Sequence, residues 1–511
     1  MTTQQENTKR IAKNTLMLYV RMLFGMLVSL YTSRVVLQVL GVEDYGIYNV
    51  VGGVVTMLSF LNDSMSGATS RFITYELGRD NLKRLNQVFS TSLIIHIFIA
   101  LLVFFVAETI GLWFLENKLI IPDHRMISAR FVFHLSVISM IIGIIQVPYN
   151  AVIISHEKMD VYAYVGILNI FLRLLIVYML VIGNYDKLIF YAVLQFIVSI
   201  IIILIYRMYC FKKYPETHFK FIIKKEYIYP MLNFSGWDLY GNASVMARTQ
   251  GVNMLINVFF GPMLNAASGI ASQVQGAVMG LANNLVTATR PQIVKLYAIG
   301  EYGSMIKLFR DSLKLSYMLL ALMSIPLMCE MNFILHLWLG TVPEYAVIFG
   351  RYTLLFNFFA NMSLLLACII HATGKIKRIS FINGSLYLMV IPFSFICYKL
   401  GANPEVAYIF NVIAVLFGML SNAWTVHLYI PEFSFKKYVY NDFMRMIILM
   451  IITYYIVLNF IKFMDESFIR FVFTFFISAS IILITGYLFL LSKDLKRSLY
   501  RQIRMKLKIW N

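Results

Sequence analysis

The chain has 511 residues, of which 60% are hydrophobic and only 14% are charged. Soluble domains contain about 45–50% apolar and about 25% charged residues, so this composition argues against a water-soluble enzyme and against a disordered chain. The net charge of +19 would suggest nucleic acid binding in a soluble protein, whereas in a membrane protein it indicates a bias toward one leaflet or an anionic partner.

Apolar runs long enough to cross a bilayer follow one another along the whole chain, since about 20 residues span the hydrocarbon core. Fourteen such runs cover residues 12–36, 45–65, 89–114, 127–153, 160–183, 188–210, 230–257, 263–287, 314–338, 345–371, 379–400, 405–430, 442–462 and 468–491. The sequence therefore predicts an all-α integral membrane protein with about 14 transmembrane helices.

Basic residues gather on one side of this predicted topology. The N-terminus, the even-numbered loops and the C-terminus hold 32 Lys and Arg, whereas the odd-numbered loops hold 8. The positive-inside rule then predicts that both termini are cytoplasmic. We expect the basic tail, residues 492–511, to lie on anionic membrane lipids. Because topology explains most of the charge, no nucleic acid partner is expected.

Metal, cofactor and nucleotide motifs are missing from the sequence. The four cysteines have no ligand spacing, and no pair of histidines has one. No glycine-rich phosphate loop is present, which argues against direct ATP drive. We therefore expect no metal and no cofactor, and coupling to a proton or sodium gradient stays open.

An internal repeat relates the second and eighth spans. Gly41 aligns with Gly261, and Ala68-Thr69 with Ala288-Thr289, all at an offset of 220; Arg71 then matches Arg290 after one gap, and Gly78 matches Gly300. Six spans separate the copies, so they have the same orientation, as in transporters built from parallel repeats. Chance similarity between apolar segments is the alternative. The predicted organisation is a six-helix lobe at 1–220, a second at 221–440, two additional helices at 441–491 and the tail at 492–511.

Residues 40–72 carry a family resemblance. Tyr45-Gly46-Ile47-Tyr48 opens the second span and Ala68-Thr69-Ser70-Arg71 ends it. This segment is similar to the second-helix signature of Wzx-type polysaccharide flippases, which belong to the MATE-like multidrug/oligosaccharidyl-lipid/polysaccharide exporter superfamily. The resemblance implies a flippase, not an enzyme, that moves undecaprenyl-diphosphate-linked oligosaccharide across the bacterial inner membrane. It also implies polysaccharide polymerase and chain-length proteins as partners.

Arginines inside or beside the spans are the candidate substrate-binding residues. A charged side chain in a span costs about 2.5–3.5 kcal/mol on insertion scales, so it normally faces a cavity or a partner. Guanidinium groups bind phosphate with two-pronged hydrogen bonds. Arg21 and Arg248 lie deep in spans one and seven, whereas Arg34, Arg71 and Arg290 lie near interfaces, where snorkelling is an equal explanation. We expect these arginines to line a cationic cavity between the lobes.

Two acidic residues are candidates for ion coupling or for structural ion pairs. Asp238 lies in the most hydrophilic span, within NFSGWDLYGNASVMARTQGVN, and either pairs with an arginine or binds a coupling ion. Glu330 lies nearer the outer end of span nine.

Two other functions remain as alternatives to a flippase that works by alternating access. One is a MATE-type drug or metabolite exporter. The other is a membrane glycosyltransferase or polymerase that uses the same lipid carrier. The second is disfavoured because such enzymes usually need a sizeable outer loop with carboxylates, and the longest outer loop here covers only about 114–126.

The charge asymmetry makes a direct prediction about topology. Reporter domains fused after Asn511 and within residues 42–45 should report opposite sides of the membrane, with the C-terminal fusion inside. Fusions that report the same side would show that the span count is wrong.

Overall fold

The fold is given by a computed structural model. It describes residues 59–117, 121–182, 186–221, 225–340 and 342–491, together with 16–25, Lys496 and scattered positions between 28 and 55. This described part is helical and contains no β-strand, and ten of its helices are long and apolar enough to cross a bilayer. The predicted all-α membrane fold is confirmed. Arg34 lies outside the described residues.

The chain divides into two compact units, one ending at Leu239 and the other beginning at Tyr240. The division falls inside one long helix, α8, which runs over Lys225–Phe260. The helices before it are α2 (Ser59–Gly78), α3 (Leu82–Val106), a π-helical turn (Ala107–Gly111), α4 (Leu112–Asn117), α5 (Met126–Ser155), α6 (Met159–Ile182) and α7 (Lys187–Lys213). Short 3-10 turns cover Asp123–Arg125 and Pro215–Thr217.

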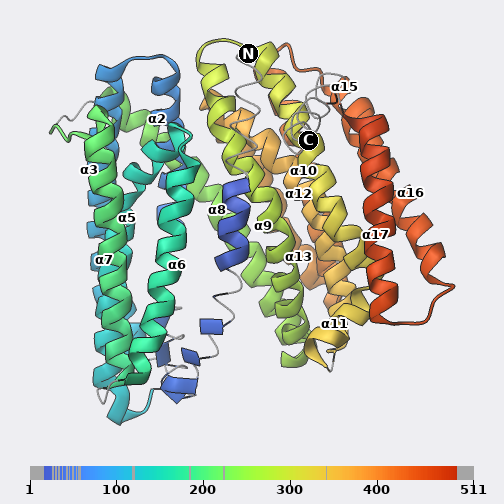
Figure 1. Cartoon of the computed structure of the whole chain (residues 1–511), viewed down its shortest axis with the longest axis horizontal. Helices are drawn as coiled ribbons and strands as arrows, with labels where there is room; N and C mark the ends of the chain where they lie inside the picture. Colours follow the sequence, from blue (N-terminus) through green and yellow to red (C-terminus); the bar gives the residue numbers. More distant parts are fainter. Residues whose placement is uncertain are drawn as a thin grey trace, which may run out of the picture. The chain divides into compact units, whose positions relative to one another are not determined.

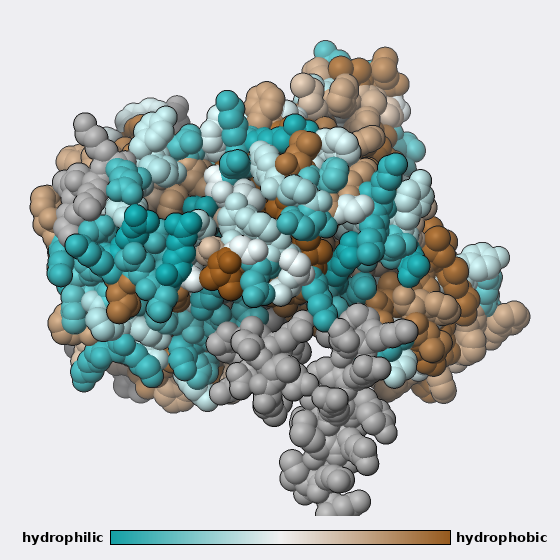
Figure 2. All heavy atoms as spheres, turned by 90° about the horizontal axis from the view of Figure 1, so that it is seen from above, coloured by the Kyte–Doolittle hydropathy of each residue, from teal (hydrophilic) through white to brown (hydrophobic). Residues whose placement is uncertain are grey.

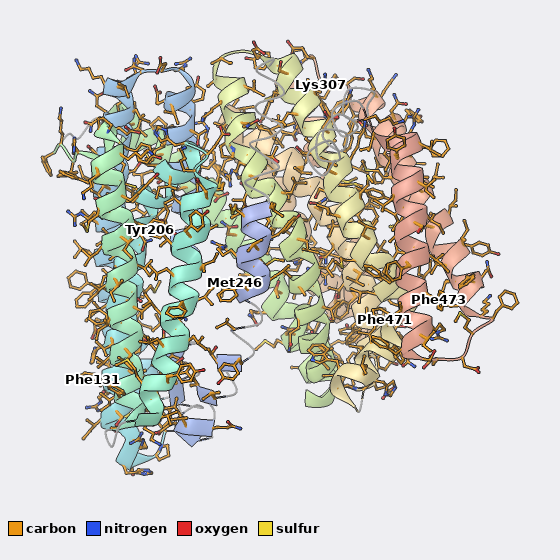
Figure 3. All side chains as sticks on the ribbon, in the orientation of Figure 1. Phe131, Tyr206, Met246, Lys307, Phe471 and Phe473 are labelled. Atoms are coloured by element: carbon orange, nitrogen blue, oxygen red, sulfur yellow. The ribbon has the colours of Figure 1, made fainter. Side chains whose placement is uncertain are left out.

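The N-terminal unit is organised around α5, which packs against α7, α3 and α2. Figure 1 shows α3, α5, α6 and α7 running along one another as long rods. Part of their apolar surface forms a core in which Phe89 and Tyr149 meet edge to face, with ring centroids 5.3 Å apart. Tyr206, labelled in Figure 3, is buried in the same core.

An ion cluster ties three segments of this unit together where α5 and α7 begin. Arg125 binds Asp44 and Asp186, with 2.9 Å between Nη1 and the Asp186 carboxylate. Ser128 also donates to Asp186, which caps α7. Burial acts to raise the pKa of Asp186, but the hydrogen bonds from Ile189 N–H, Ser128 and Arg125 outweigh it and lower this pKa. The cluster thus stabilises the unit at neutral pH and loses that contribution as the pH falls through the lowered pKa.

The C-terminal unit is organised around α12, which is largely buried and packs against α9 and α14. In the same unit, α10 packs against α9, and α13 packs against α14. Its helices are α9 (Pro262–Ala298), α10 (Tyr302–Cys329), α11 (Met331–Leu339), α12 (Ala346–Thr373), α13 (Lys377–Lys399), α14 (Val406–Tyr429), α15 (Phe435–Lys437), a π-helical turn (Tyr438–Phe443), α16 (Met444–Ile461), α17 (Phe468–Thr485) and a second π-helical turn (Gly486–Leu490).

The last two long helices, α16 and α17, are fastened to α10 by buried polar contacts. At one end of α10, Glu330 accepts from Arg470 Nη2 at 2.6 Å and from Thr474 Oγ1 at 2.9 Å. Toward the other end, Arg310 faces Asp442 at 3.3 Å. The tyrosine at position 317 also donates to the Met446 carbonyl at 2.7 Å. These helices are therefore an integral part of the C-terminal unit.

Hydrophilic residues gather at helix ends, as expected for a bilayer protein. Figure 2 looks along the helices from above, and hydrophilic side chains cover much of the face that it shows. Residues 79–84, in the α2–α3 turn, are exposed. The sides of the helices carry exposed aromatic residues such as Phe473 on α17, labelled in Figure 3, of which 50% is exposed.

The two units share turn geometry at the spacing of the sequence repeat. Gly41 and Gly261 both have positive φ, 79° and 83°. Asp80 and Gly300, also 220 positions apart, have φ of 54° and 80°. The second helix of each unit ends two residues before this turn, at Gly78 and at Ala298. The structural partner of Gly300 is therefore Asp80, and the sequence match of Gly300 to Gly78 is wrong by two residues.

The Glu330 contact makes a prediction about stability. Glu330→Gln leaves Arg470 without its buried counter-charge, and breaking a buried pair costs about 3–5 kcal/mol. Glu466→Gln is the matched control, because Glu466 contacts the same Arg470 at 3.5 Å with a side chain 53% exposed, and exposed pairs contribute about 0–1 kcal/mol. Thermal unfolding in nanodiscs should show a larger loss of stability for Glu330→Gln than for Glu466→Gln. Equal losses of stability would contradict the role of Glu330 as the buried counter-charge of Arg470.

Candidate functional site

The candidate arginines and acidic residues have different surroundings. Arg71 on α2 is buried, with its guanidinium carbon 4.6 Å from the centroid of the Phe72 ring. Arg290 on α9 approaches His371 on α12, with 3.2 Å between Nη2 and Nδ1. Asp238 lies half-buried on α8. Glu330 is occupied by Arg470, so its contacts are those of a structural ion pair.

Arg21 packs on α6 within the N-terminal unit. Its guanidinium carbon lies 4.6 Å from the centroid of the Tyr162 ring, close enough for a cation–π interaction. The aliphatic part of the side chain crosses Gly166, where an added Cβ would collide with Arg21 Cδ. A small residue at position 166 therefore permits this close approach.

Arg248 on α8 is enclosed between aromatic rings. Only 9% of the residue is exposed, and its guanidinium carbon lies 4.9 Å from the Phe356 centroid and 4.8 Å from the Tyr387 centroid. Two of its nitrogens, Nε and Nη1, are buried and make no hydrogen bond with any described residue. The aromatic rings cover the guanidinium, but no carboxylate among the described residues pairs with it.

The first and fifth helices of each unit cross at a glycine. Gly384 on α13 stands 218 positions after Gly166, and an added Cβ there would meet Tyr240 at 2.6 Å and Ser244 at 2.8 Å. Tyr240 thus stands at this crossing in the C-terminal unit, where the N-terminal unit has Arg21. Arg248 lies eight residues farther along α8, which is about 12 Å at 1.5 Å per residue. Arg21 and Arg248 therefore do not occupy equivalent positions on the first helices of the two units.

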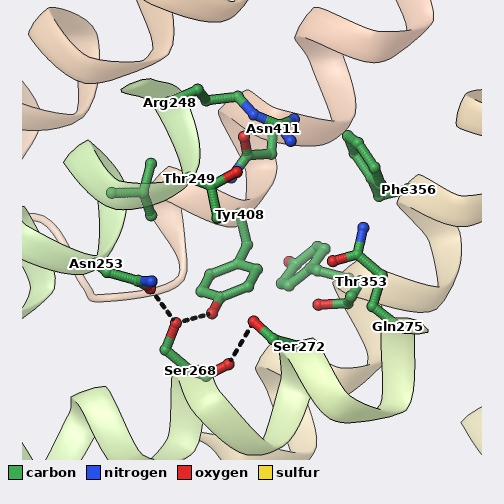
Figure 4. A pocket seen from close by; sticks show the side chains of 12 residues that line it. Arg248, Thr249, Asn253, Ser268, Ser272, Gln275, Thr353, Phe356, Tyr408 and Asn411 are labelled. Carbon is green, nitrogen blue, oxygen red and sulfur yellow. Dashed lines mark hydrogen bonds between the residues drawn. The ribbon is translucent and has the colours of Figure 1, made fainter. Parts of the chain in front are cut away.

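Arg248 lines a polar chamber inside the C-terminal unit, shown in Figure 4. The chamber has a volume of about 60 Å³. Arg248 is its only charged lining residue, and all lining positions belong to the described part of the chain. The lining comes from α8, α9, α12 and α14 and comprises Arg248, Thr249, Val252, Asn253, Ser268, Ser272, Gln275, Tyr352, Thr353, Phe356, Tyr408 and Asn411.

Hydrogen bonds fix one wall of the chamber. Tyr408 donates to Ser268 Oγ at 2.9 Å, and Ser268 donates in turn to Asn253 Oδ1 at 2.6 Å. The ring of Tyr408 stacks on Phe349 at 4.2 Å, which holds its hydroxyl in place. On another wall, Asn411 Oδ1 is buried and accepts from no described residue. The chamber thus contains both an unpaired cation and an unpaired acceptor.

The sequence identified Arg248 but not the rest of the chamber. Asn253 belongs to the hydrophilic run noted in span seven, and Ser268 and Ser272 belong to the repeat segment of span eight. Tyr408 and Asn411 stand 160 and 163 positions after Arg248, in a span without polar clustering. Neutral polar residues so far apart carry no local signal of a shared site.

The chain matches a known protein family. The profile of the family described as "Polysaccharide biosynthesis protein" matches residues 11–297. No curated protein matches the chain. The family resemblance found in residues 40–72 agrees with this match.

Solved structures share the fold at low sequence identity. "Crystal structure of MATE in the bent conformation" has a TM-score of 0.73 at 13% identity, covering 86% of this chain and 99% of that one. "Outward-facing conformation of a multidrug resistance MATE family transporter of the MOP superfamily" has a TM-score of 0.72 at 14% identity, covering 84% and 97%.

A third solved structure with this fold is "Reverse polarity of binding pocket suggests different function of a MOP superfamily transporter from Pyrococcus furiosus Vc1 (DSM3638)". Its TM-score is 0.70 at 13% identity, covering 82% of this chain and 96% of that one. The chain therefore has the MATE fold.

Replacing glycine by alanine should have different effects at the crossing of α8 and α13 and at an open site on α5. Gly384→Ala should destabilise the C-terminal unit by about 1–3 kcal/mol, because the added methyl group overpacks against the Tyr240 ring. Gly143→Ala on α5, where an added Cβ meets nothing within 4 Å, should be neutral or stabilise by up to about 1 kcal/mol. Thermal unfolding of both variants checks this, and an unchanged melting temperature for Gly384→Ala would contradict the crossing.

Proposed function

We propose that this chain, which belongs to the polysaccharide biosynthesis protein family, is a flippase for polyprenyl-diphosphate-linked oligosaccharide. Its proposed place is the bacterial inner membrane, with both termini in the cytoplasm. Transport by alternating access is the proposed mechanism, in keeping with the MATE fold.

The observation that carries the proposal is the unpaired Arg248 in its chamber. An arginine inside a bilayer span is costly unless it meets water, a partner or a ligand. Here aromatic rings cover the guanidinium and neutral polar side chains surround it, so its positive charge is uncompensated among the described residues. Such a site favours an anionic ligand, and a lipid-linked glycan brings negative charge on its head group.

Arg21 supplies a second intramembrane cation, in the N-terminal unit. This arginine is half-buried, and its guanidinium lies over the Tyr162 ring. In the proposed mechanism, the membrane-embedded arginines bind the head group while the polyprenyl tail stays in lipid. Release requires contacts that differ between the inward-open and outward-open states.

Drug export is the less favoured function. An exporter of cationic drugs needs a negative or neutral site, whereas the chamber's only charge is positive.

We also propose how transport is driven and which proteins act after it. A proton or sodium ion at Asp238 would drive transport, and polymerase and chain-length proteins would receive the flipped oligosaccharide.

Loss of the two arginines should impair flipping. Arg21→Ala and Arg248→Ala should each lower complementation of a flippase-deficient strain at matched expression, and the double variant should lower it by at least about tenfold, or about 1.4 kcal/mol. Arg248→Lys should retain part of the activity, because the charge stays but the planar fork is lost. Arg173→Gln, at an exposed arginine bonded to Asn169, is the control.

The direct assay is analysis of lipid-linked sugars after deletion of the gene. Deletion should cause oligosaccharide to accumulate on the polyprenyl carrier at the cytoplasmic side. No accumulation would overturn the flippase proposal, and full activity of the double variant would exclude this pair of arginines as the anion site.

A further inference from the structure

The charge and the hydrogen-bonding groups of the chamber indicate which kind of anionic group it binds. We infer that the Arg248 chamber binds the acidic edge of one sugar, a carboxylate with a neighbouring hydroxyl, rather than the diphosphate of the carrier. This inference rests on the proposed function.

The charge of the chamber matches a monoanion. Arg248 is the only charged residue among the twelve that line it, all of them in the described part. A carboxylate carries one negative charge, whereas a diphosphate carries more than one at neutral pH. A second phosphate charge would therefore meet only neutral Ser, Thr, Asn, Gln and aromatic groups.

The unpaired atoms of the chamber require both an acceptor and a donor. Arg248 Nε and Nη1 need acceptors, and Asn411 Oδ1 needs a donor. A buried polar atom that lacks a hydrogen-bond partner destabilises the site, and a charged one does so more strongly. A carboxylate supplies the acceptors and an adjacent sugar hydroxyl supplies the donor. An ionised diphosphate has acceptor oxygens only and would leave Asn411 unsatisfied.

The rest of the lining also suits a sugar. The Tyr408, Ser268 and Asn253 hydrogen bonds hold one wall rigid, and its oxygens remain available to hydroxyl groups. Phe356 lines the chamber and packs on Arg248, which limits the freedom of the guanidinium. Preorganised donors of this kind bind a ligand at a lower entropic cost.

The volume limits how much of the ligand enters. A water molecule needs about 10–15 Å³ of such space, so a chamber of about 60 Å³ holds about four water-sized groups. A carboxylate and one hydroxyl fill that space. The remainder of the sugar and of the glycan must lie outside it.

The test uses the full-length protein in nanodiscs and four probes: glucuronate, glucose, acetate and pyrophosphate. Ligand-detected NMR titration measures the affinity for each. Glucuronate should bind at least about tenfold more tightly than glucose, a difference of about 1.4 kcal/mol. Pyrophosphate should not displace it. Equal binding of glucose and glucuronate, or displacement by pyrophosphate, would overturn the inference.

Variants of Arg248 and Asn411 test the carboxylate contact and the hydroxyl contact separately. Arg248→Gln should weaken glucuronate binding by at least about tenfold, because it removes a charge-assisted hydrogen bond to the carboxylate. Asn411→Leu should weaken glucuronate binding and leave acetate binding unchanged, because only glucuronate presents a hydroxyl to Asn411. Asn411→Asp should abolish binding of both, because it adds a negative charge to the chamber that Arg248 lines. Arg173→Gln should bind like the wild type.

Each variant is first checked for a melting temperature close to that of the wild type. If the gene deletion accumulates lipid-linked oligosaccharide but glucuronate binding does not depend on Arg248, the inference fails and the flippase proposal stands. If the deletion accumulates none while Arg248-dependent glucuronate binding persists, the flippase proposal fails and the chamber remains an acidic-sugar site.

Discussion

A charged side chain inside a bilayer needs a counter-charge, a polar surrounding or a ligand, and this requirement sorts the arginines of the protein by role. Arg470 meets it with Glu330, a buried carboxylate on a neighbouring helix, and the result is a fastening between helices. Arg21 lies over an aromatic ring and stays half-exposed. Arg248 is enclosed by rings and neutral polar groups and has no counter-charge among the described residues. Of these three arrangements, the last leaves two buried guanidinium nitrogens without a hydrogen-bond partner among the described residues.

The two units share a helix crossing, but different residues stand at that crossing in each unit. In both units the first and fifth helices approach at a glycine, Gly166 in one and Gly384 in the other. Arg21 stands at this crossing in the N-terminal unit, whereas Tyr240 stands there in the C-terminal unit. The C-terminal arginine is displaced two turns along α8, to the chamber. The two units are thus alike in helix packing and different in where they place positive charge.

The sequence predicts the membrane fold and the repeat because both depend on local signals. Long apolar runs identify spans one at a time, and Gly41 and Gly261 are recognisable by their spacing and share a positive φ. The match of Gly78 to Gly300 is wrong because the turn tolerates Asp80 where the other copy has glycine.

Contacts between distant residues are what the sequence does not predict. Glu330 and Arg470 are 140 positions apart, and no local sequence pattern predicts that they form an ion pair. The chamber presents the same difficulty, since Ser268, Tyr408 and Asn411 are ordinary residues of apolar spans until helix packing brings them together with Arg248. Arg248 itself is identifiable, because a deep arginine is conspicuous by its cost in lipid.

The central claim is that Arg248 binds an anionic group of the transported glycan. The most direct measurement is a cryo-electron microscopy structure of the full-length protein in nanodiscs with its lipid-linked oligosaccharide. The account predicts density for an acidic group within hydrogen-bonding distance of the Arg248 guanidinium, with a hydroxyl at Asn411. A bound glycan that leaves the chamber filled only by water would contradict it.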